Sequence, residues 1–382
     1  MQIEHLPYRS GSRNRGAPHV VVYSPLRVAE HGHEAVTCCA LAKKVADLLG
    51  YEFGGEYNLK AVKPDRPMFL VPTTTITTAQ ARALGVLTNR NLFGGVVPYA
   101  FVATKAIVHG LRANDSPAPE HWCHRFSESV RELVPNGFMA FSLQDALRAG
   151  TQMLERGALR IKPAWASGGR GQLVVSSSKE LNAALSLFEE DEVATHGLAL
   201  EENFLDPITY SIGTVSLGDV NASYYGTQRA TNDNFGAVVY GGSDLIVCRS
   251  DFEALLNRPM PAEARVAAQL ARRFDAAVAL HFPEFFASRR NYDVIAGIDQ
   301  TGHRRCAVIE QSWRIGGASG AELAALELFK DDPGLHCVHA STVELYGRDH
   351  ELPGGATVYF DGVDDKVGRI TKYAIVKSHG YL

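Results

Sequence analysis

The stretch of sequence that decides the fold reads Leu159-Arg160-Ile161-Lys162-Pro163 and, after four further residues, Gly168-Gly169-Arg170-Gly171-Gln172-Leu173-Val174-Val175. The first run predicts a strand that ends at Pro163, because proline lacks the N–H of a sheet ladder and keeps the residue before it extended. The glycines let the backbone approach an anion closely and direct N–H groups toward it. The last three residues predict a returning strand. Lys162 therefore leaves a strand just before a glycine-rich loop, which is the arrangement that a bound triphosphate requires.

This loop differs from the phosphate-binding loop of P-loop proteins. The sequence contains no G-x-x-x-x-G-K-[ST] pattern, and no helix is expected directly after the glycines. A glycine-rich hairpin is also typical of a mobile surface turn. The phosphate-binding interpretation therefore depends on what the rest of the chain supplies.

A second pair of strands is predicted around Thr301-Gly302, where two β-rich runs flank a turn. If the hairpin is centred between these two residues, Asp293 and Glu310 face each other with Cβ atoms roughly 5 Å apart. Two such carboxylates repel by roughly 3 to 4 kcal/mol at an effective dielectric near 20, and a cation between them reverses the sign. The pair therefore predicts Mg²⁺ held by carboxylates and substrate phosphates. The alternative is a shifted register, or two carboxylates that face water.

The residues after Glu310 extend this predicted site. Ser312 and Arg314 follow at intervals of two, so the three side chains share one face of a strand. An arginine in this position can bind a phosphate or a substrate carboxylate through two hydrogen bonds. The row therefore predicts a carboxylate, a hydroxyl and a guanidinium side by side.

Three other arginines are weighed as ligands of the acceptor carboxylate or of the phosphates. Arg229 and Arg290 are candidates for that role, with simple surface solvation as the alternative. For Arg289 we expect surface solvation.

Together these residues resemble the ATP-grasp superfamily over roughly residues 97–319. In that family one lysine at the start of a small lid domain and another just before a glycine-rich loop contact the nucleotide phosphates, and Lys105 and Lys162 match these positions. The resemblance implies that ATP is also contacted by the loop residues Gly168, Gly169, Gly171 and Gln172 and by the adenine hinge.

The adenine hinge of the family is a short hydrophobic strand that ends in glutamate, and residues 198–204, Leu-Ala-Leu-Glu-Glu-Asn-Phe, are similar to it. Glu201 and Glu202 are alternatives for the hinge role, because neighbouring residues of a strand face opposite sides. We favour Glu201 as the residue that faces the nucleotide.

The family's Mg²⁺ ligands are an acidic residue on one strand and an E-x-N-x-R-like string on the next. Asp293 and the string Glu310-Gln311-Ser312-Trp313-Arg314 are similar, with serine at position 312 where asparagine is usual. A hydroxyl is a poorer Mg²⁺ ligand than an amide oxygen. We therefore expect weaker metal binding or a water-bridged contact at Ser312.

The resemblance implies an α/β protein with the ATP-grasp fold: an N-terminal open parallel sheet, a small α+β lid and a larger C-terminal α+β domain. Buried-type strands over residues 19–24, 68–71 and 94–97, alternating with helices over 34–50 and 79–84, independently predict the parallel sheet. We expect a disordered lead-in over 1–17, an N-terminal α/β domain over 18–103, the lid over 104–200 and the C-terminal subdomain over 201–382.

The activity implied by the resemblance is that of an ATP- and Mg²⁺-dependent ligase, in which Lys162 and Arg314 act in catalysis. It would activate a carboxylate as an acylphosphate for attack by an amine or a similar nucleophile, and release ADP and phosphate. Two alternatives stay open: an ATP-binding regulator with lost or weak turnover, for which the serine at 312 is the reason, and an ATP-dependent phosphotransferase.

Composition narrows the partners. The chain has 38 Lys and Arg against 42 Asp and Glu, a net charge of −4, and no basic stripe, which argues against nucleic acid. We find no 18-residue apolar run and no export leader, so we expect a cytoplasmic protein that does not bind membranes. The six cysteines show no C-x-x-C spacing, and reduced thiols are expected. Because such ligases often dimerise, a homodimer stays open.

Overall fold

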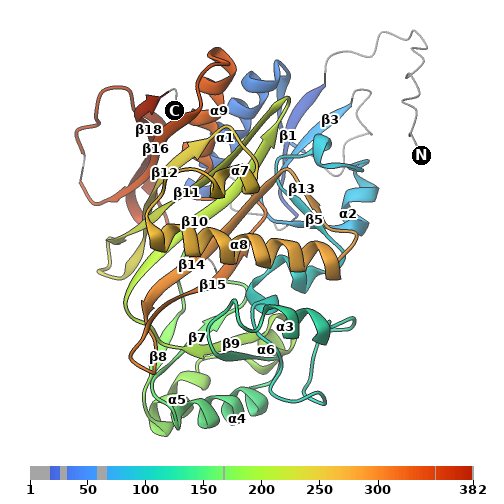
Figure 1. Ribbon diagram of the computed structural model, residues 1–382, viewed down its shortest axis with the longest axis vertical. Helices are drawn as coiled ribbons and strands as arrows, with labels where there is room; N and C mark the ends of the chain where they lie inside the picture. The colour runs from blue at the N-terminus through green and yellow to red at the C-terminus, as the bar shows by residue number, and fades with distance from the viewer. Residues whose placement is uncertain (1–17, 26–31, 58–66, 167, 349, 381–382) are drawn as a thin grey trace.

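The computed structural model describes residues 18–25, 32–57, 67–166, 168–348 and 350–380. The lead-in expected over residues 1–17 lies outside these described residues. Figure 1 shows a lower lobe coloured green, and an upper part in which the blue N-terminal and the red C-terminal elements lie together. Segments at the two ends of the sequence therefore build the same body.

The N-terminal strands form a small parallel sheet. β1 (His19–Tyr23) lies between β2 (Glu52–Glu56) and β3 (Met68–Pro72) and pairs in parallel with both. The helix between β1 and β2, α1 (His33–Leu49), ends at Gly50, whose φ of 68° is the left-handed conformation that favours glycine. The parallel sheet and the helix predicted over 34–50 are thereby confirmed.

One predicted strand belongs elsewhere. β5 (Gly95–Val97) pairs in parallel with β4 (Ile76–Thr77) and antiparallel with β13 (Phe286–Ala287), and these three strands form a separate sheet. The prediction of one continuous sheet through residues 94–97 is therefore wrong, because β5 takes a partner from almost 200 residues later in the chain. α2 (Thr78–Ala83) leads from β4 toward β5, and the short 3₁₀ turn η1 (Asn89–Asn91) precedes β5.

The lower lobe is a four-stranded antiparallel sheet covered by helices. Its strand order is β6 (Gly137–Ala140), β9 (Leu198–Glu202), β7 (Leu159–Pro163) and β8 (Leu173–Val175). The helices are α4 (Leu143–Leu154), α5 (Ser178–Leu185) and α6 (Glu190–His196). The side chains of Ser142 and Ser177 accept N–H bonds at the starts of α4 and α5, which places both helices where capping chemistry favours them. The strand, glycine loop and returning strand predicted from residue 159 onward are thus present as β7 and β8.

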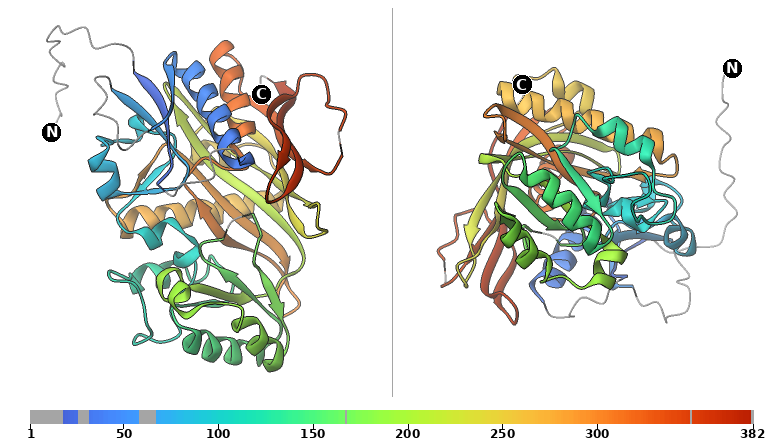
Figure 2. Two further views of the ribbon diagram at one scale, coloured as in Figure 1. Left: turned by 180° about the vertical axis from the view of Figure 1, so that it is seen from behind. Right: turned by 90° about the horizontal axis from the view of Figure 1, so that it is seen from below.

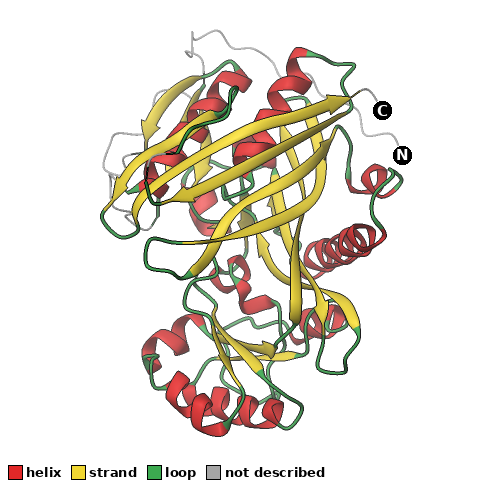
Figure 3. Cartoon of the chain, turned by 90° about the vertical axis from the view of Figure 1, so that its left-hand side faces the viewer, coloured by secondary structure: helices red, strands yellow, loops and turns green. Residues whose placement is uncertain are grey.

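The upper part contains an eight-stranded antiparallel sheet whose long strands are visible in Figure 3. In spatial order its strands are β15 (Arg304–Ser312), β14 (Arg289–Ile298), β10 (Leu205–Leu217), β11 (Val220–Asn232), β12 (Val238–Cys248), β16 (Cys337–Tyr346), β18 (Gly368–Gly380) and β17 (Thr357–Asp364). The two strands predicted to carry the acidic pair therefore lie together at one edge.

Helices cover both faces of this sheet. α8 (Ala262–His281) packs on one face with α3 (His124–Val130) and α7 (Phe252–Leu256), around the buried rings of Phe126, Phe274 and Tyr292. On the other face α1 packs beside α9 (Ser319–Asp331), and Figure 2 shows the blue and orange helices next to each other. The short turns η2 (Ala100–Ala103) and η3 (Lys105–Ile107) lead toward the lower lobe. The large sheet is thereby a buried, rigid support for side chains at its edge.

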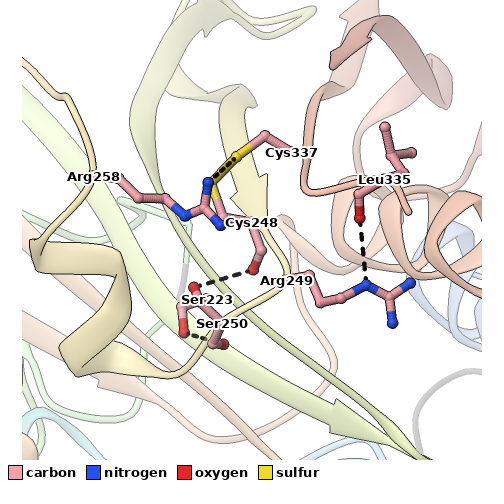
Figure 4. The surroundings of a disulfide bond; sticks show 7 residues. All are labelled: Ser223, Cys248, Arg249, Ser250, Arg258, Leu335 and Cys337. Atoms are coloured by element: carbon pink, nitrogen blue, oxygen red, sulfur yellow. Dashed lines mark hydrogen bonds between the residues drawn. A yellow bond between two sulfur atoms is a disulfide. The ribbon is translucent and has the colours of Figure 1, made fainter. Parts of the chain in front are cut away.

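Two cysteines are joined. Cys248 ends β12 and Cys337 begins β16, at directly paired positions of the two strands, and their sulfurs form a disulfide (Figure 4). The expectation of six reduced thiols is wrong for this pair, because 89 residues separate them and no local spacing announces the contact. The other cysteines, all within the described residues, are free: Cys38, Cys39, Cys123 and Cys306.

Within the described parts of the chain, no helix combines the length and the apolar character needed to cross a bilayer.

Candidate nucleotide- and metal-binding site

A cleft of about 1900 Å³ lies between the N-terminal sheet, the lower lobe and the large sheet. Most residues that the sequence singled out line it: Lys162, Gly168, Gly169, Gln172, Glu201, Glu202, Arg229, Asp293, Glu310, Ser312 and Arg314. Lys105, Gly171 and Arg290 are not part of the lining. The fold thus brings residues from β7, β9, β14 and β15 to one space.

On the lower-lobe side, Lys162 is already paired with a carboxylate. It stands on β7 opposite β9, where its ammonium forms an ion pair with Glu201, and His109 Nε2 lies 3.1 Å from the same carboxylate. All three side chains are at least 95% buried. Burial raises the pKa of Glu201, but the ammonium of Lys162 and the contact with His109 outweigh it and bring the pKa to about 2. Glu201 is therefore a carboxylate with its countercharge built in.

Glu202 points away from Lys162, as strand alternation requires. Its carboxylate accepts the Asn136 backbone N–H at 2.8 Å and pairs with Arg305. Both carboxylates of the predicted hinge are thus engaged by protein groups.

Lys105 connects the glycine loop with the large sheet. Its side chain is 6% exposed; the ammonium donates to the carbonyl of Ala166 and lies 3.3 Å from Glu310 Oε1. Lys105 therefore sets its charge beside one member of the acidic pair, at the base of the loop.

The loop adopts the backbone that its glycines permit. Gly168, Gly169 and Gly171 have φ values of 66°, 81° and 69°, a region that other residues rarely adopt. Gln172 accepts a hydrogen bond from Arg160 at 3.1 Å, and Arg170 is close enough to Tyr346 on β16 to lower the pKa of that phenol against the effect of burial. The loop thus reaches from the lower lobe to the large sheet, across the cleft.

Asp293 and Glu310 are direct cross-strand neighbours, which confirms the predicted pairing. The reason differs from the assumed one. Near the turn Ile298 pairs with Arg304, so the hairpin is centred on one residue and not between two. A β-bulge at Ile309 inserts one extra residue and restores the partnership of the two carboxylates.

The surroundings of Asp293 fit a cation. Burial and the neighbouring Glu310 carboxylate raise the pKa of Asp293 to about 6. Its Oδ1 atom accepts from Ser211 at 3.3 Å, and Gln228 donates to that hydroxyl at 3.1 Å. Among the described residues, no group of three or more His, Cys, Asp or Glu is placed so that it could hold a metal ion. A Mg²⁺ ion here would take the two carboxylates and complete its shell with neutral oxygens and phosphates, which suits its chemistry.

The arginines separate into two groups. Arg314 lines the cleft, bonds to the carbonyl of Ile315 at 2.7 Å and forms no ion pair with any described residue. Arg229 also lines the cleft and is 3.2 Å from Asp244. Arg290 instead pairs with Asp275 of α8 at 2.9 Å, outside the cleft. Arg314 is therefore a cleft arginine without a protein carboxylate.

The expectation that Arg289 is solvated is wrong. It is 1% exposed and makes two hydrogen bonds of 2.8 Å to Glu322 of α9, which is fully buried. It also donates to the carbonyls of Ser312 and Arg314. Arg289 is therefore a buried residue whose hydrogen bonds hold the strand segment that carries Ser312 and Arg314.

Some cleft residues were missed at the sequence level. Asn291 lines the cleft two residues before Asp293, and this interval of two was a readable signal. His33 and Thr37, on one face of α1, line the cleft too, and their Nδ1 and Oγ1 atoms find no hydrogen-bond partner among the described residues. No sequence signal marked them or His109.

Solved structures are similar to this chain in fold. Phosphoribosylamine–glycine ligase from Thermotoga maritima superposes with a TM-score of 0.52 at 15% identity, over 95% of this chain and 93% of that one. Biotin carboxylase from Campylobacter jejuni gives 0.50 at 10% identity, over 94% and 87%. N5-carboxyaminoimidazole synthase from Aspergillus clavatus gives 0.50 at 13%, over 95% and 94%.

The likeness to these enzymes establishes the fold: the chain has the ATP-grasp fold, as the sequence resemblance implied. The chain belongs to the family described as "Protein of unknown function (DUF3182)", which matches residues 21–374. No curated protein matches its sequence.

Proposed function

We propose that this protein is an ATP- and Mg²⁺-dependent ligase that activates a carboxylate as an acylphosphate and joins it to an amine or a similar nucleophile. The observation that carries the proposal is the meeting of Lys162 and the glycine loop with the Asp293–Glu310 pair in one cleft. Cations with N–H donors on one side and an acidic pair on the other are what a metal–triphosphate complex needs.

The phosphate-binding side has defined parts. The N–H groups of Gly168 and Gly169 and the ammonium of Lys162 would face phosphate oxygens, with Gly171 and Gln172 ending the loop, while Lys105 holds Glu310 and the loop base in place. The hinge strand with Glu201 and Glu202 borders the nucleotide. When bound, Mg²⁺ would neutralise the charge on the transferring phosphoryl group; Asp293, Glu310 and Ser312 are the residues placed to hold it.

The acceptor side centres on Arg314. A carboxylate oxygen attacks the γ-phosphorus, the bond to the β–γ bridging oxygen breaks, and ADP leaves. The nucleophile then attacks the acyl carbon and loses a proton as phosphate departs. Arg314, with no carboxylate partner among the described residues, would hold the acceptor carboxylate, and Arg229 is a second cation on this side. Arg290 is left out, since it serves Asp275.

Solved neighbours support this chemistry. The biotin carboxylase from Campylobacter jejuni was crystallised in complex with beta-gamma-ATP, and the synthase from Aspergillus clavatus with ADP and 5-aminoimidazole ribonucleotide. From these neighbours we carry over only the use of an adenine nucleotide. The small-molecule carboxylate and amine substrates and the cytoplasmic location are part of our own proposal, and a homodimer is left open. The division at residues 103 and 200 belongs to the same proposal.

The test is product analysis. Purified protein is incubated with Mg²⁺-ATP and pools of carboxylates and amines, and ADP, AMP and phosphate are separated. We expect ADP and phosphate, lost in Glu310→Gln and kept in Arg290→Lys, whose side chain lies outside the cleft. AMP with pyrophosphate would contradict the proposal.

One alternative has a specific observation behind it. Ser312 stands in place of the usual amide ligand, which is the reason to consider an ATP-binding regulator with lost or weak turnover. Such a regulator would be stabilised by Mg²⁺-ATP and would form no ADP with any substrate pool. Phosphorylated acceptor without ligation would instead indicate a phosphotransferase.

A further inference from the structure

Asn291 lies close to Ser312, the position at which the usual amide ligand is missing. It is directly opposite Ser312 in the pairing of β14 with β15, and it shares the strand face of Asp293. Its side chain lines the cleft and is 6% exposed. The amide of Asn291 therefore lies directly across the two paired strands from Ser312, the position at which the ATP-grasp pattern has asparagine.

The amide of Asn291 can take two orientations. As placed, the amide oxygen is 2.9 Å from the Tyr224 hydroxyl and the nitrogen is 2.8 Å from Asp293 Oδ1. The two ends of an amide have nearly the same shape, so hydrogen-bond partners decide which is which. The partners of Tyr224 therefore show whether the opposite orientation of the Asn291 amide is also possible.

Tyr224 has one proton and two neighbours. Its hydroxyl lies 2.7 Å from Glu322 Oε1, and that carboxylate is held by the Arg289 guanidinium and can only accept. Because the phenol proton goes to Glu322, the phenol oxygen can accept from Asn291 once the amide is turned over. Turning it would place the NH₂ group against Tyr224 and the oxygen beside Asp293, whose carboxylate otherwise receives the amide N–H.

In the turned orientation two acceptor oxygens, that of Asn291 and Oδ1 of Asp293, would lie about 2.8 Å apart. Such a contact is repulsive unless a cation lies against both, so the turned amide belongs to the metal-bound protein. Neighbouring ligands of an octahedral Mg²⁺ ion, each 2.0–2.1 Å from the metal, are about 2.9 Å apart. The spacing is therefore that of two adjacent ligands of one ion.

We propose that Asn291 supplies, from β14, the amide oxygen ligand for Mg²⁺ that serine does not supply at position 312 on β15. The inference rests on the proposed function and makes its metal site specific to this chain. Glu322, Arg289 and Tyr224 are positioning residues, because they orient the amide and never touch the ion.

The experiment measures metal binding directly. Mn²⁺ replaces Mg²⁺, and free Mn²⁺ is counted by electron paramagnetic resonance, with and without ADP. Asn291→Ala should weaken Mn²⁺ binding about tenfold or more, whereas Ser312→Ala should change it less than about threefold. The double variant N291A/S312N, which returns an amide to β15, should recover most of the affinity.

Several outcomes overturn the proposal. They are a tenfold loss in Ser312→Ala, unchanged affinity in Asn291→Ala, or no Mn²⁺ binding by wild type. Should Asn291→Ala fail to fold, Ser312→Ala decides alone. A further measurement, ADP binding in the presence of EDTA, distinguishes failure of this proposal from failure of the proposed function. Absence of ADP binding would count against the proposed function. Mn²⁺ binding that depends on Asn291 would still support Asn291 as a metal ligand.

Discussion

The two sides of the cleft treat a buried carboxylate in opposite ways. On the lower-lobe side, Glu201 meets the ammonium of Lys162 and His109, and its pKa is lowered to about 2 despite burial. On the large-sheet side, burial and Glu310 raise the pKa of Asp293 to about 6, and no described residue gives Asp293 an ion pair.

Only the lower-lobe side is neutralised without a ligand. Glu201 and Lys162 neutralise each other inside the protein, so this pair contributes to the stability of the lower lobe as well as to the phosphate binding that we propose. Asp293 has hydrogen bonds but no ion pair with any described residue, so a bound cation would make its charged form more favourable. This contrast between the two sides can be tested by mutation.

The largest expected effect comes from removing the lower-lobe countercharge. Lys162→Met leaves Glu201 buried with only His109, and loss of one partner of a buried ion pair costs about 3–5 kcal/mol. Urea unfolding measures it. The control is K162M/E201Q, which lacks both charges and should recover most of the stability without recovering ADP formation. A single variant as stable as wild type would break the contrast.

The same double variant gives the pH dependence. The pKa of Glu201 is about 2 in the folded state against 4.5 ordinarily, so its stabilising contribution is complete above pH 4.5 and disappears as the pH falls toward 2. The unfolding free energy of wild type minus that of K162M/E201Q should therefore fall between pH 5 and pH 3, within the window where wild type still unfolds reversibly. A constant difference would mean that Glu201 has no lowered pKa.

On the other side, removing charge should stabilise. Asp293→Asn relieves the repulsion with Glu310 and the cost of a buried charge, so the ligand-free protein should gain about 1–2 kcal/mol at pH 8. It should also lose the extra thermal stabilisation that Mg²⁺ adds to ADP. Scanning calorimetry with ADP, with and without Mg²⁺, measures both. Destabilisation of the ligand-free protein would show that Asp293 is a structural residue like Glu201.

The smallest effect concerns the glycine loop. Gly168 has a φ of 66° and an added Cβ would meet no atom within 4 Å, so Gly168→Ala tests backbone conformation alone, at about 1–2 kcal/mol. Gly50, with φ of 68° and equally open space, is the matched control away from the loop. We expect Gly168→Ala to raise the KM for ATP several-fold and Gly50→Ala to lower only the Tm. Equal effects on KM would contradict a role for the loop.

Local pattern predicted much of this molecule. The strand before Pro163, the glycine loop and the hairpin around residue 301 depend on neighbours in sequence, and all are present. The pairing of Asp293 with Glu310 was also predicted, although it needs a bulge at Ile309 that the pattern did not show. A bulge depends on packing against the rest of the sheet and leaves no mark in residue type.

The errors concern partners that are far apart in the chain. Arg289 was expected in water, and only the arrival of Glu322 on α9 makes its burial favourable. The prediction for β5 is wrong because its partner strand, β13, lies far along the chain, near residue 286. For Glu201 the sequence identified the residue but not its counterions, Lys162 on a neighbouring strand and His109. Long-range contacts of this kind are set by tertiary packing, which no window of sequence contains.

The disulfide between Cys248 and Cys337 has a consequence of connectivity. It ties into one covalent ring the segment that carries Asn291, Asp293, Glu310, Ser312 and Arg314. A protease cut anywhere between the two cysteines would open a ring and not release a fragment, so a nicked chain keeps its full mass until a reductant is added. The segment that carries the acidic edge of the sheet therefore stays covalently attached to the rest of the chain after a single cut.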